Sequence, residues 1–230
     1  MSAAVLQSQF ASVLGGDLDW RCRPAPETVP SGIAEIDADS GGLPRGCLTE
    51  IFGAGSSGRA TIMAAILAQA TARQEFCALV DAEDAFDPAS AERAGVCLAR
   101  LLWVRCGHNA EHALRAADLL IQGGGFGVVA LDLGDTAAAN ARRISLTSWF
   151  RLRRAVEHTP TVLVAIARQS NAKTCATLQL ECARERTVWS GAHPGRLLRG
   201  VCVRASHPLG HPRGHRRSTI CLPVFTAKAI

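Results

Sequence analysis

A glycine-rich segment about a quarter of the way along the chain, residues 50–61, reads E-I-F-G-A-G-S-S-G-R-A-T. Apolar residues lead into the glycines, and an alanine-rich helical pattern follows them at once. This is the strand–loop–helix order of a phosphate-binding loop, in which backbone N–H groups and a helix N-terminus face an anion. The segment therefore predicts a phosphate cradle at the end of a buried strand.

The backbone of this loop keeps the glycine spacing of the G-x-x-x-x-G-K-[ST] pattern. Gly53 and Gly58 occupy the two glycine positions, and Ser56 and Ser57 lie between them. Glycines permit the tight turn and the close approach of an anion to the backbone. We therefore expect these four residues to belong to a nucleotide-binding or anion-binding loop.

The two side chains that carry the chemistry of such a loop are changed. Arg59 stands where a lysine reaches the outer phosphates, and Ala60 stands where a hydroxyl ligates magnesium. A planar guanidinium does not replace a compact ammonium, and a methyl group binds no metal. Thr61 has a hydroxyl, but one helical position rotates it by about a quarter of a turn. We expect little or no ATP hydrolysis, with weak ATP/Mg²⁺ binding or a purely structural loop as the open alternatives.

Composition indicates a folded protein, with 48% hydrophobic and 20% charged residues among 230. No apolar run is long enough to span a bilayer, and the N-terminus lacks the pattern of a secretory signal. We expect a cytoplasmic protein with no membrane contact. Nine cysteines form no C-x-x-C pair, so small buried residues are expected rather than disulfides or zinc ligands.

Positive charge gathers toward the C-terminus. From residue 183 onward there are nine Arg or Lys and one acid, +8, so the preceding residues sum to −3. Within this part, residues 207–217 combine histidines with prolines and glycines, which prevent a helical metal site. A basic loop whose Arg213, Arg216 and Arg217 contact phosphates is the favoured interpretation.

Alternating apolar strands and helical patterns predict an α/β fold with a central, mainly parallel sheet flanked by helices. Residues 1–30 are expected to form an N-terminal helix (2–14) and connector, and residues 31–230 a core domain whose part 176–230 holds basic strands and a loop. Antiparallel strands near 177–182, 200–205 and 218–224 extend the sheet. The other strands are expected at 47–52, 76–80, 101–105, 127–132 and 161–167, with helices at 31–39, 88–95, 109–122 and 138–157.

The helix expected at 138–157 is rich in arginine. Its apolar residues do not all fit on one face, so part of its apolar surface should remain exposed. A protein partner, nucleic acid and an ordinary solvated basic face are all compatible with this pattern. The candidate contact residues are Arg142, Arg143, Arg151, Arg153 and Arg154.

Four segments resemble the RecA recombinase family in order and in spacing. They read S-G-I-A-E-I-D (31–37), G-G-L-P-R-G-C-L-T-E-I-F-G (41–53), S-S-G-R-A-T (56–61) and A-L-V-D-A-E-D-A-F-D-P (78–88). The resemblance implies a RecA-like P-loop core. The segments in the places of the two DNA-binding loops of RecA are short, and no further C-terminal domain is expected. A short relative with an altered loop is similar to the ImuA family, SOS mutasome accessory factors associated with ImuB, and more distantly to the division inhibitor SulA.

The resemblance also implies roles for single residues. Glu83 matches the glutamate that activates the attacking water, and Asp132 matches the aspartate that holds the magnesium shell, although both roles are vestigial if hydrolysis is lost. A solvated turn is the alternative for the acids around Glu83. Arg168 replaces a glutamine that senses the terminal phosphate, with Gln169 after it.

Together these features favour an adaptor that serves DNA-damage-induced mutagenesis and binds a RecA-type or ImuB-type partner. The alternatives are an active DNA-dependent ATPase of the RecA type and a basic DNA-binding module.

Overall fold

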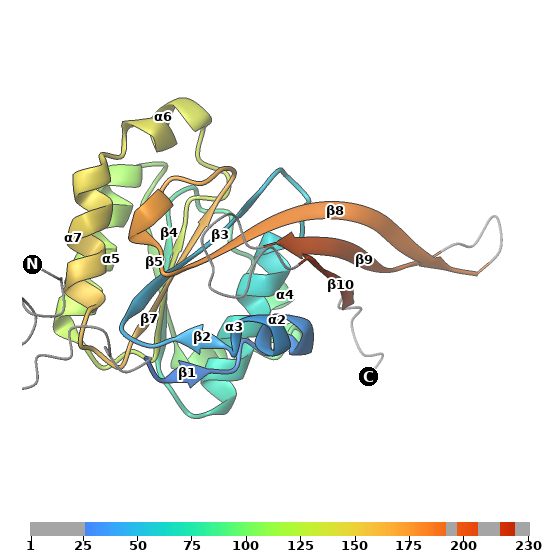
Figure 1. Cartoon of the computed structure of the whole chain (residues 1–230). Helices are drawn as coiled ribbons and strands as arrows, with labels where there is room; N and C mark the ends of the chain where they lie inside the picture. The colour runs from blue at the N-terminus through green and yellow to red at the C-terminus, as the bar shows by residue number, and fades with distance from the viewer. Residues whose placement is uncertain (1–25, 192–196, 207–216, 224–230) are drawn as a thin grey trace, which may run out of the picture.

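A single sheet organises the protein in the computed structural model, which describes residues 26–191, 197–206 and 217–223. The sheet has eight strands in the order β10-β9-β8-β3-β7-β6-β4-β5, and β1 and β2 form a separate small ribbon (Figure 1). The strands are β1 (Thr28–Val29), β2 (Leu43–Pro44), β3 (Cys47–Gly53), β4 (Cys77–Asp81), β5 (Leu101–Arg105), β6 (Val128–Asp132), β7 (Val162–Ala167), β8 (Leu178–Ser190), β9 (Leu197–Ser206) and β10 (Arg217–Pro223).

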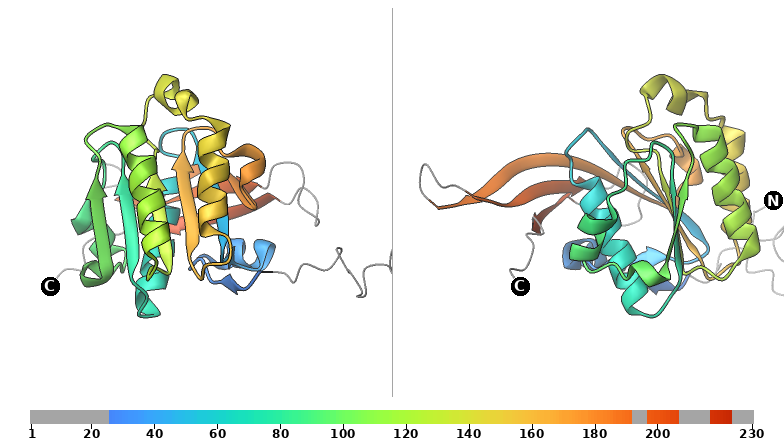
Figure 2. Two further views of the ribbon diagram at one scale, coloured as in Figure 1. Left: turned by 90° about the vertical axis from the view of Figure 1, so that its left-hand side faces the viewer. Right: turned by 180° about the vertical axis from the view of Figure 1, so that it is seen from behind.

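Helices cover both faces of the sheet, as Figure 2 shows. One hydrophobic core lies between the sheet and α2, α3 and α4, and a second lies between the sheet and α5 and α7. The helices are α2 (Ala34–Ser40), α3 (Arg59–Ala72), α4 (Pro88–Arg93), α5 (Ala110–Gly123), α6 (Ala138–Arg143) and α7 (Leu146–Val156), with 3₁₀ turns η1 (Leu98–Arg100) and η2 (Lys173–Cys175). The predicted α/β architecture is confirmed.

Strand β3 lies near the middle of the eight-stranded sheet, between β8 and β7. It pairs in parallel with β7 on one side and with β8 on the other. Every residue of β7 is buried, because helices cover both faces of this region. The loops after β3, β6 and β7 therefore emerge at the same edge of the sheet.

The C-terminal strands extend the sheet away from this parallel part. Strands β9 and β10 are antiparallel to their neighbours, as expected, but β8 is parallel to β3 and corrects the prediction for that strand. Strand β8 also continues to Ser190 rather than ending at residue 182. Its outer half and β9 form a ribbon that protrudes from the body of the protein (Figure 1).

The single helix predicted over 138–157 is wrong. It divides into α6 and α7, because Ile144 has an extended backbone (φ −64°, ψ 113°) and Ser145 starts a new helix as its N-cap. The Ser145 hydroxyl accepts a hydrogen bond from the backbone N–H of Ser148 at 3.2 Å. A serine that caps a helix satisfies an otherwise unpaired N–H, which favours a fresh helix start at this point. The N-terminal helix expected at 2–14 lies outside the described residues.

Candidate functional site

The glycine-rich loop joins β3 to α3, as its sequence predicts. Ser56 (φ 58°) and Gly58 (φ 88°) both adopt left-handed backbone conformations, and Gly58 is the N-cap of α3. The strand–loop–helix geometry of a phosphate cradle is therefore present.

Close packing explains why both loop glycines are needed. A Cβ atom at Gly53 would lie 2.2 Å from the carbonyl oxygen of Cys182 on β8. A Cβ atom at Gly58 would lie 2.7 Å from side-chain atoms of both Val203 and Leu222, on β9 and β10. The loop therefore packs tightly between α3 and the C-terminal strands, which agrees with a structural role for the loop.

Arg59 does not project from the loop toward solvent. It is buried, and its guanidinium donates hydrogen bonds to the carbonyl oxygens of Gly53, Ala54 (3.0 Å) and Gly134 (2.6 Å). Three carbonyl acceptors hold the guanidinium at the base of the cradle. To bind a phosphate, the Arg59 side chain would have to give up these hydrogen bonds. Arg59 therefore ties the loop after β3 to the loop after β6.

A second arginine reaches the same point. The Nε atom of Arg168, which follows β7, donates to the Gly134 carbonyl oxygen at 3.2 Å. Arg59 and Arg168 each also lie 3.5 Å from a carboxylate oxygen of Asp135. Because that carboxylate is 56% exposed, the two ion pairs alone contribute little to stability. The hydrogen bonds that both arginines donate to the Gly134 carbonyl oxygen are the stronger interaction. The two arginines join the loops after β3, β6 and β7.

The residues around Asp132 do not fit a magnesium ion. Ala60 offers no ligand, and an Asp132 carboxylate oxygen accepts a hydrogen bond from the Gly134 N–H at 2.7 Å. Burial raises the pKa of Asp132 to about 6, and the nearby Asp81 and Asp135 carboxylates add to this shift. Mg²⁺ prefers several charged or polar oxygens in octahedral geometry, which this set does not supply.

Glu83 is held on the side of β4 that faces away from the phosphate loop. Its carboxylate contacts Nδ1 of His108 at 2.9 Å, and His108 follows the edge strand β5. Strands β7 and β6 separate β4 from β3, a distance of about 14 Å at the usual strand spacing. The buried Asp81 shapes the turn by accepting hydrogen bonds from three backbone N–H groups and the Trp103 indole. The acids of this turn are therefore partnered, and the catalytic role of Glu83 stays a prediction.

A hollow of about 500 Å³ opens beside the phosphate loop, on the β8 side. The Ser57 side chain lines it and is buried, and its hydroxyl has no hydrogen-bond partner among the described residues. Two guanidinium-bearing residues, Arg168 and Arg184, also line the hollow. An unpaired hydroxyl beside cationic side chains suits an anion, so this part of the cradle fits a phosphate even though the magnesium set does not. The remaining lining residues are Phe52, Gly53, Ala54, Gly55, Gln169, Ser170, Glu181, Cys182 and Ala183.

Glu50 is a site residue that the sequence analysis did not identify. This fully buried carboxylate in β3 accepts hydrogen bonds from the N–H groups of Asn171 (2.6 Å) and Ala172 (2.8 Å). It also accepts from the Ser170 hydroxyl (2.9 Å) and the Gln179 amide (2.8 Å). Glu50 thereby fixes the segment after β7 against β3. In the sequence, the signal for this role was a single acid inside a strand of mostly apolar residues, because a buried charge needs hydrogen-bond partners.

The five arginines of α6 and α7 have different surroundings. Arg151 pairs with Asp118 on α5, and Arg153 donates to the Thr174 carbonyl oxygen at 3.4 Å. Arg142, Arg143 and Arg154 are exposed. In the basic C-terminal loop, Arg213 and Arg216 lie outside the described residues, and only the backbone of Arg217, in β10, is described. Their roles in contacting a partner or nucleic acid stay predictions.

Cysteines and histidines form no metal centre in the described ranges, where no group of three or more His, Cys, Asp or Glu is placed to hold an ion. The Cys77, Cys175, Cys182 and Cys202 thiols are buried, and burial raises the pKa of Cys77 and of Cys182 to about 12. These thiols act as small core residues. No helix in the part of the chain that the structure describes is long and apolar enough to cross a membrane.

Comparison of the sequence with known proteins shows the family to which the chain belongs. The model of the RecA N-terminal domain matches residues 16–145. Protein RecA of Methylococcus capsulatus is 43% identical over 108 residues, which cover 46% of this chain and 31% of the relative. Protein RecA of Chloroflexus aurantiacus is 32% identical over 160 residues, 63% of this chain and 45% of the relative. This chain thus matches less than half the length of each relative. Since the family model covers more than half of this chain, and the phosphate loop joins a central strand to a helix, the chain belongs to the RecA family.

Proposed function

We propose that this protein is an accessory member of the RecA family that serves DNA-damage-induced mutagenesis and repair with little or no ATP hydrolysis. It acts as an adaptor for a RecA-type or ImuB-type partner in the SOS mutasome, in the cytoplasm. The observation that carries this proposal is the position of the Arg59 guanidinium, bound to three backbone carbonyls of the loops around it.

The neighbouring residues support the loss of hydrolysis. Ala60 leaves the first turn of α3 without the hydroxyl that ligates magnesium, and Asp132 has a raised pKa. The Glu83 carboxylate is held by His108. Removing one well-placed group that stabilises the transition state typically costs about 10²–10³ in rate, and here several positions are altered at once. The Ser57 hydroxyl still suits an anion, so weak nucleotide binding without turnover is the expected behaviour.

Three measurements on the full chain test this proposal. ATP hydrolysis is followed with Mg²⁺, with and without single-stranded DNA, and the melting temperature is measured with and without ATP and Mg²⁺. The double variant Arg59→Lys/Ala60→Thr restores both chemical side chains, and Arg59→Lys alone is its matched control. An adaptor should show no DNA-stimulated hydrolysis, and the double variant should bind nucleotide about tenfold more tightly than the wild type.

An active DNA-dependent ATPase of the RecA type is the second candidate, and family membership together with relatives named Protein RecA favours it. In that case the wild type hydrolyses ATP at a DNA-stimulated rate, and the double variant changes little. Such a rate in the wild type would refute the adaptor proposal.

A DNA-binding role for the basic C-terminal region is part of the same proposal. Its affinity for DNA should fall steeply with salt, because each neutralised phosphate releases counterions. A flat response to salt, or no binding at low salt, would remove this role.

A further inference from the structure

Helices α6 and α7 concentrate positive charge on one part of the protein. Residues 138–156 contain five arginines and no Asp, Glu or Lys, whereas the whole chain has a net charge of only +5. Trp149, Leu152 and Val156 bury the inner side of α7 in the core. The helix is therefore firmly seated, and among the described residues its outer sides are exposed.

An exposed apolar pair lies in the middle of this charge. Leu146 and Phe150 are each 43% exposed, and their spacing of four residues places them on one side of α7. The exposed Arg154 continues the same row, and the exposed Arg143 precedes it in α6. Residues 146–154 span about 12 Å at the helical rise. We call Leu146, Phe150 and Arg154 the α7 surface: two exposed apolar side chains followed by a cation on one side of the helix.

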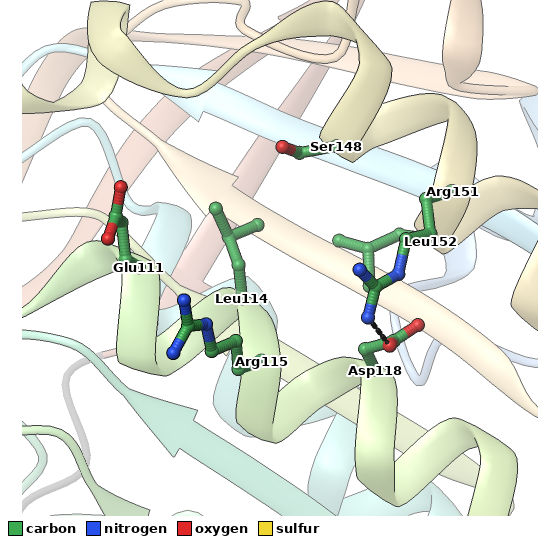
Figure 3. A pocket seen from close by; sticks show the side chains of 7 residues that line it. All are labelled: Glu111, Leu114, Arg115, Asp118, Ser148, Arg151 and Leu152. Carbon is green, nitrogen blue, oxygen red and sulfur yellow. Dashed lines mark hydrogen bonds and ion pairs between the residues drawn. The ribbon is translucent and has the colours of Figure 1, made fainter.

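A hollow of about 200 Å³ lies between α5 and α7 (Figure 3). Arg151 reaches across it to Asp118, and Leu114 and Leu152 line it together with Glu111, Arg115 and Ser148. The pairing with Asp118 raises the pKa of Arg151, so this guanidinium remains charged. The hollow carries two acids, Glu111 and Asp118, beside Arg115 and Arg151, so its charge is balanced. It lies on the flank of α7 that faces α5, apart from the row of Leu146 and Phe150.

We propose that the α7 surface binds an acidic segment of a partner protein that carries apolar side chains flanked by carboxylates. The inference rests on the proposed function in taking a protein as the partner. Charge complementarity requires an anionic partner, and arginines on such a surface pair well with carboxylates. Exposed Leu and Phe side chains gain by burial against apolar groups, which a phosphodiester backbone does not provide. An acidic peptide meets both requirements, whereas duplex DNA, whose bases are stacked inside the helix, meets only the first. Bases of single-stranded DNA can stack on an aromatic side chain, so the experiment includes a single-stranded oligonucleotide.

The test selects binders without assuming a sequence. A display library of random 16-residue peptides is selected on the full-length chain, and recovered peptides are labelled for fluorescence anisotropy. Peptides that combine Asp or Glu with Leu, Phe or Trp should be recovered. Phe150→Ala should weaken binding at least tenfold, as expected for a central contact residue. Arg154→Glu should do the same, because it sets a carboxylate against the acids of the peptide. Leu119→Ala is the matched control, because Leu119 on α5 is 69% exposed and lies outside the α7 surface.

Several outcomes overturn the inference. They are recovered peptides that lack acids, affinities that Phe150→Ala and Arg154→Glu leave unchanged, an equal loss in Leu119→Ala, and failure to recover any acidic binder. A labelled oligonucleotide of deoxythymidine that binds the wild type and is lost in the same two variants would assign the surface to nucleic acid. Circular dichroism melts confirm that each variant is folded. ATP hydrolysis is measured on the same proteins, so a failed surface and a failed adaptor proposal give different results.

Discussion

Removing the Arg59 side chain should destabilise the protein, because its guanidinium joins the loop after β3 to the loop after β6. The guanidinium donates to three carbonyl oxygens, and those of Gly53 and Gly134 belong to buried residues. In Arg59→Ala the Gly53 carbonyl loses its charged donor, whereas the Gly134 carbonyl keeps the hydrogen bond from Nε of Arg168 at 3.2 Å. One buried group left unsatisfied costs about 1–3 kcal/mol, so the free energy of unfolding should fall by about 1–3 kcal/mol. The exposed Ala54 carbonyl regains water and adds little.

The assay is urea denaturation of the full chain, followed by tryptophan fluorescence, to which the buried Trp149 contributes, and by circular dichroism. A lower midpoint with an unchanged slope reports a true loss of stability. Arg154→Ala is the control, since Arg154 is exposed on α7 and its removal should change stability by no more than about 0.5 kcal/mol. If Arg59→Ala also changes stability by less than about 0.5 kcal/mol, the guanidinium is not tied to these carbonyls, and the reasoning that Arg59 is unavailable to phosphate is refuted.

Three further predictions concern the surroundings of the loop. Asp132→Asn should raise the melting temperature at pH 7.5. The pKa of Asp132 is about 6, above the usual value near 4, so the native protein binds more protons than the unfolded chain between these pH values. The stability of the wild type therefore falls as pH rises through that window, and the variant avoids this loss. The gain, up to about 3 kcal/mol at neutral pH, should vanish on acidification to pH 4, and a gain independent of pH would contradict this explanation. Glu50→Gln turns an acceptor of four hydrogen bonds into a group with its own N–H donors. The free energy of unfolding in urea should fall by about 2–4 kcal/mol, and hydrogen exchange of the backbone amides after β7 should become faster. Unchanged exchange in that segment would count against the role of Glu50. Gly58→Ala places a methyl group 2.7 Å from two side chains at φ 88° and should lower stability by about 2–4 kcal/mol in thermal melts, whereas a neutral result would mean that β9 and β10 do not press on the loop.

The order of elements was predictable because each carries a local pattern. Continuous apolar runs such as residues 162–166 indicate strands buried on both faces, and the structure has β7 over Val162–Ala167. Residues 101–105 were expected as a strand and form β5. The sequence did not predict that the helix over 138–157 breaks at Ser145 into α6 and α7. One serine in a helical pattern is a weak signal until its cap geometry is known.

The residue pattern alone indicates that a phosphate loop follows a buried strand and that its lysine and hydroxyl are replaced by Arg59 and Ala60. It did not determine where the guanidinium goes. Only the tertiary structure brings the Gly134 carbonyl, 75 residues away along the chain, within 2.6 Å of Arg59. The same holds for Glu50, whose hydrogen-bond donors lie more than 100 residues away. Local periodicity and spacing specify elements, whereas contacts between loops depend on strand order, because parallel strands bring distant chain ends to one edge of the sheet.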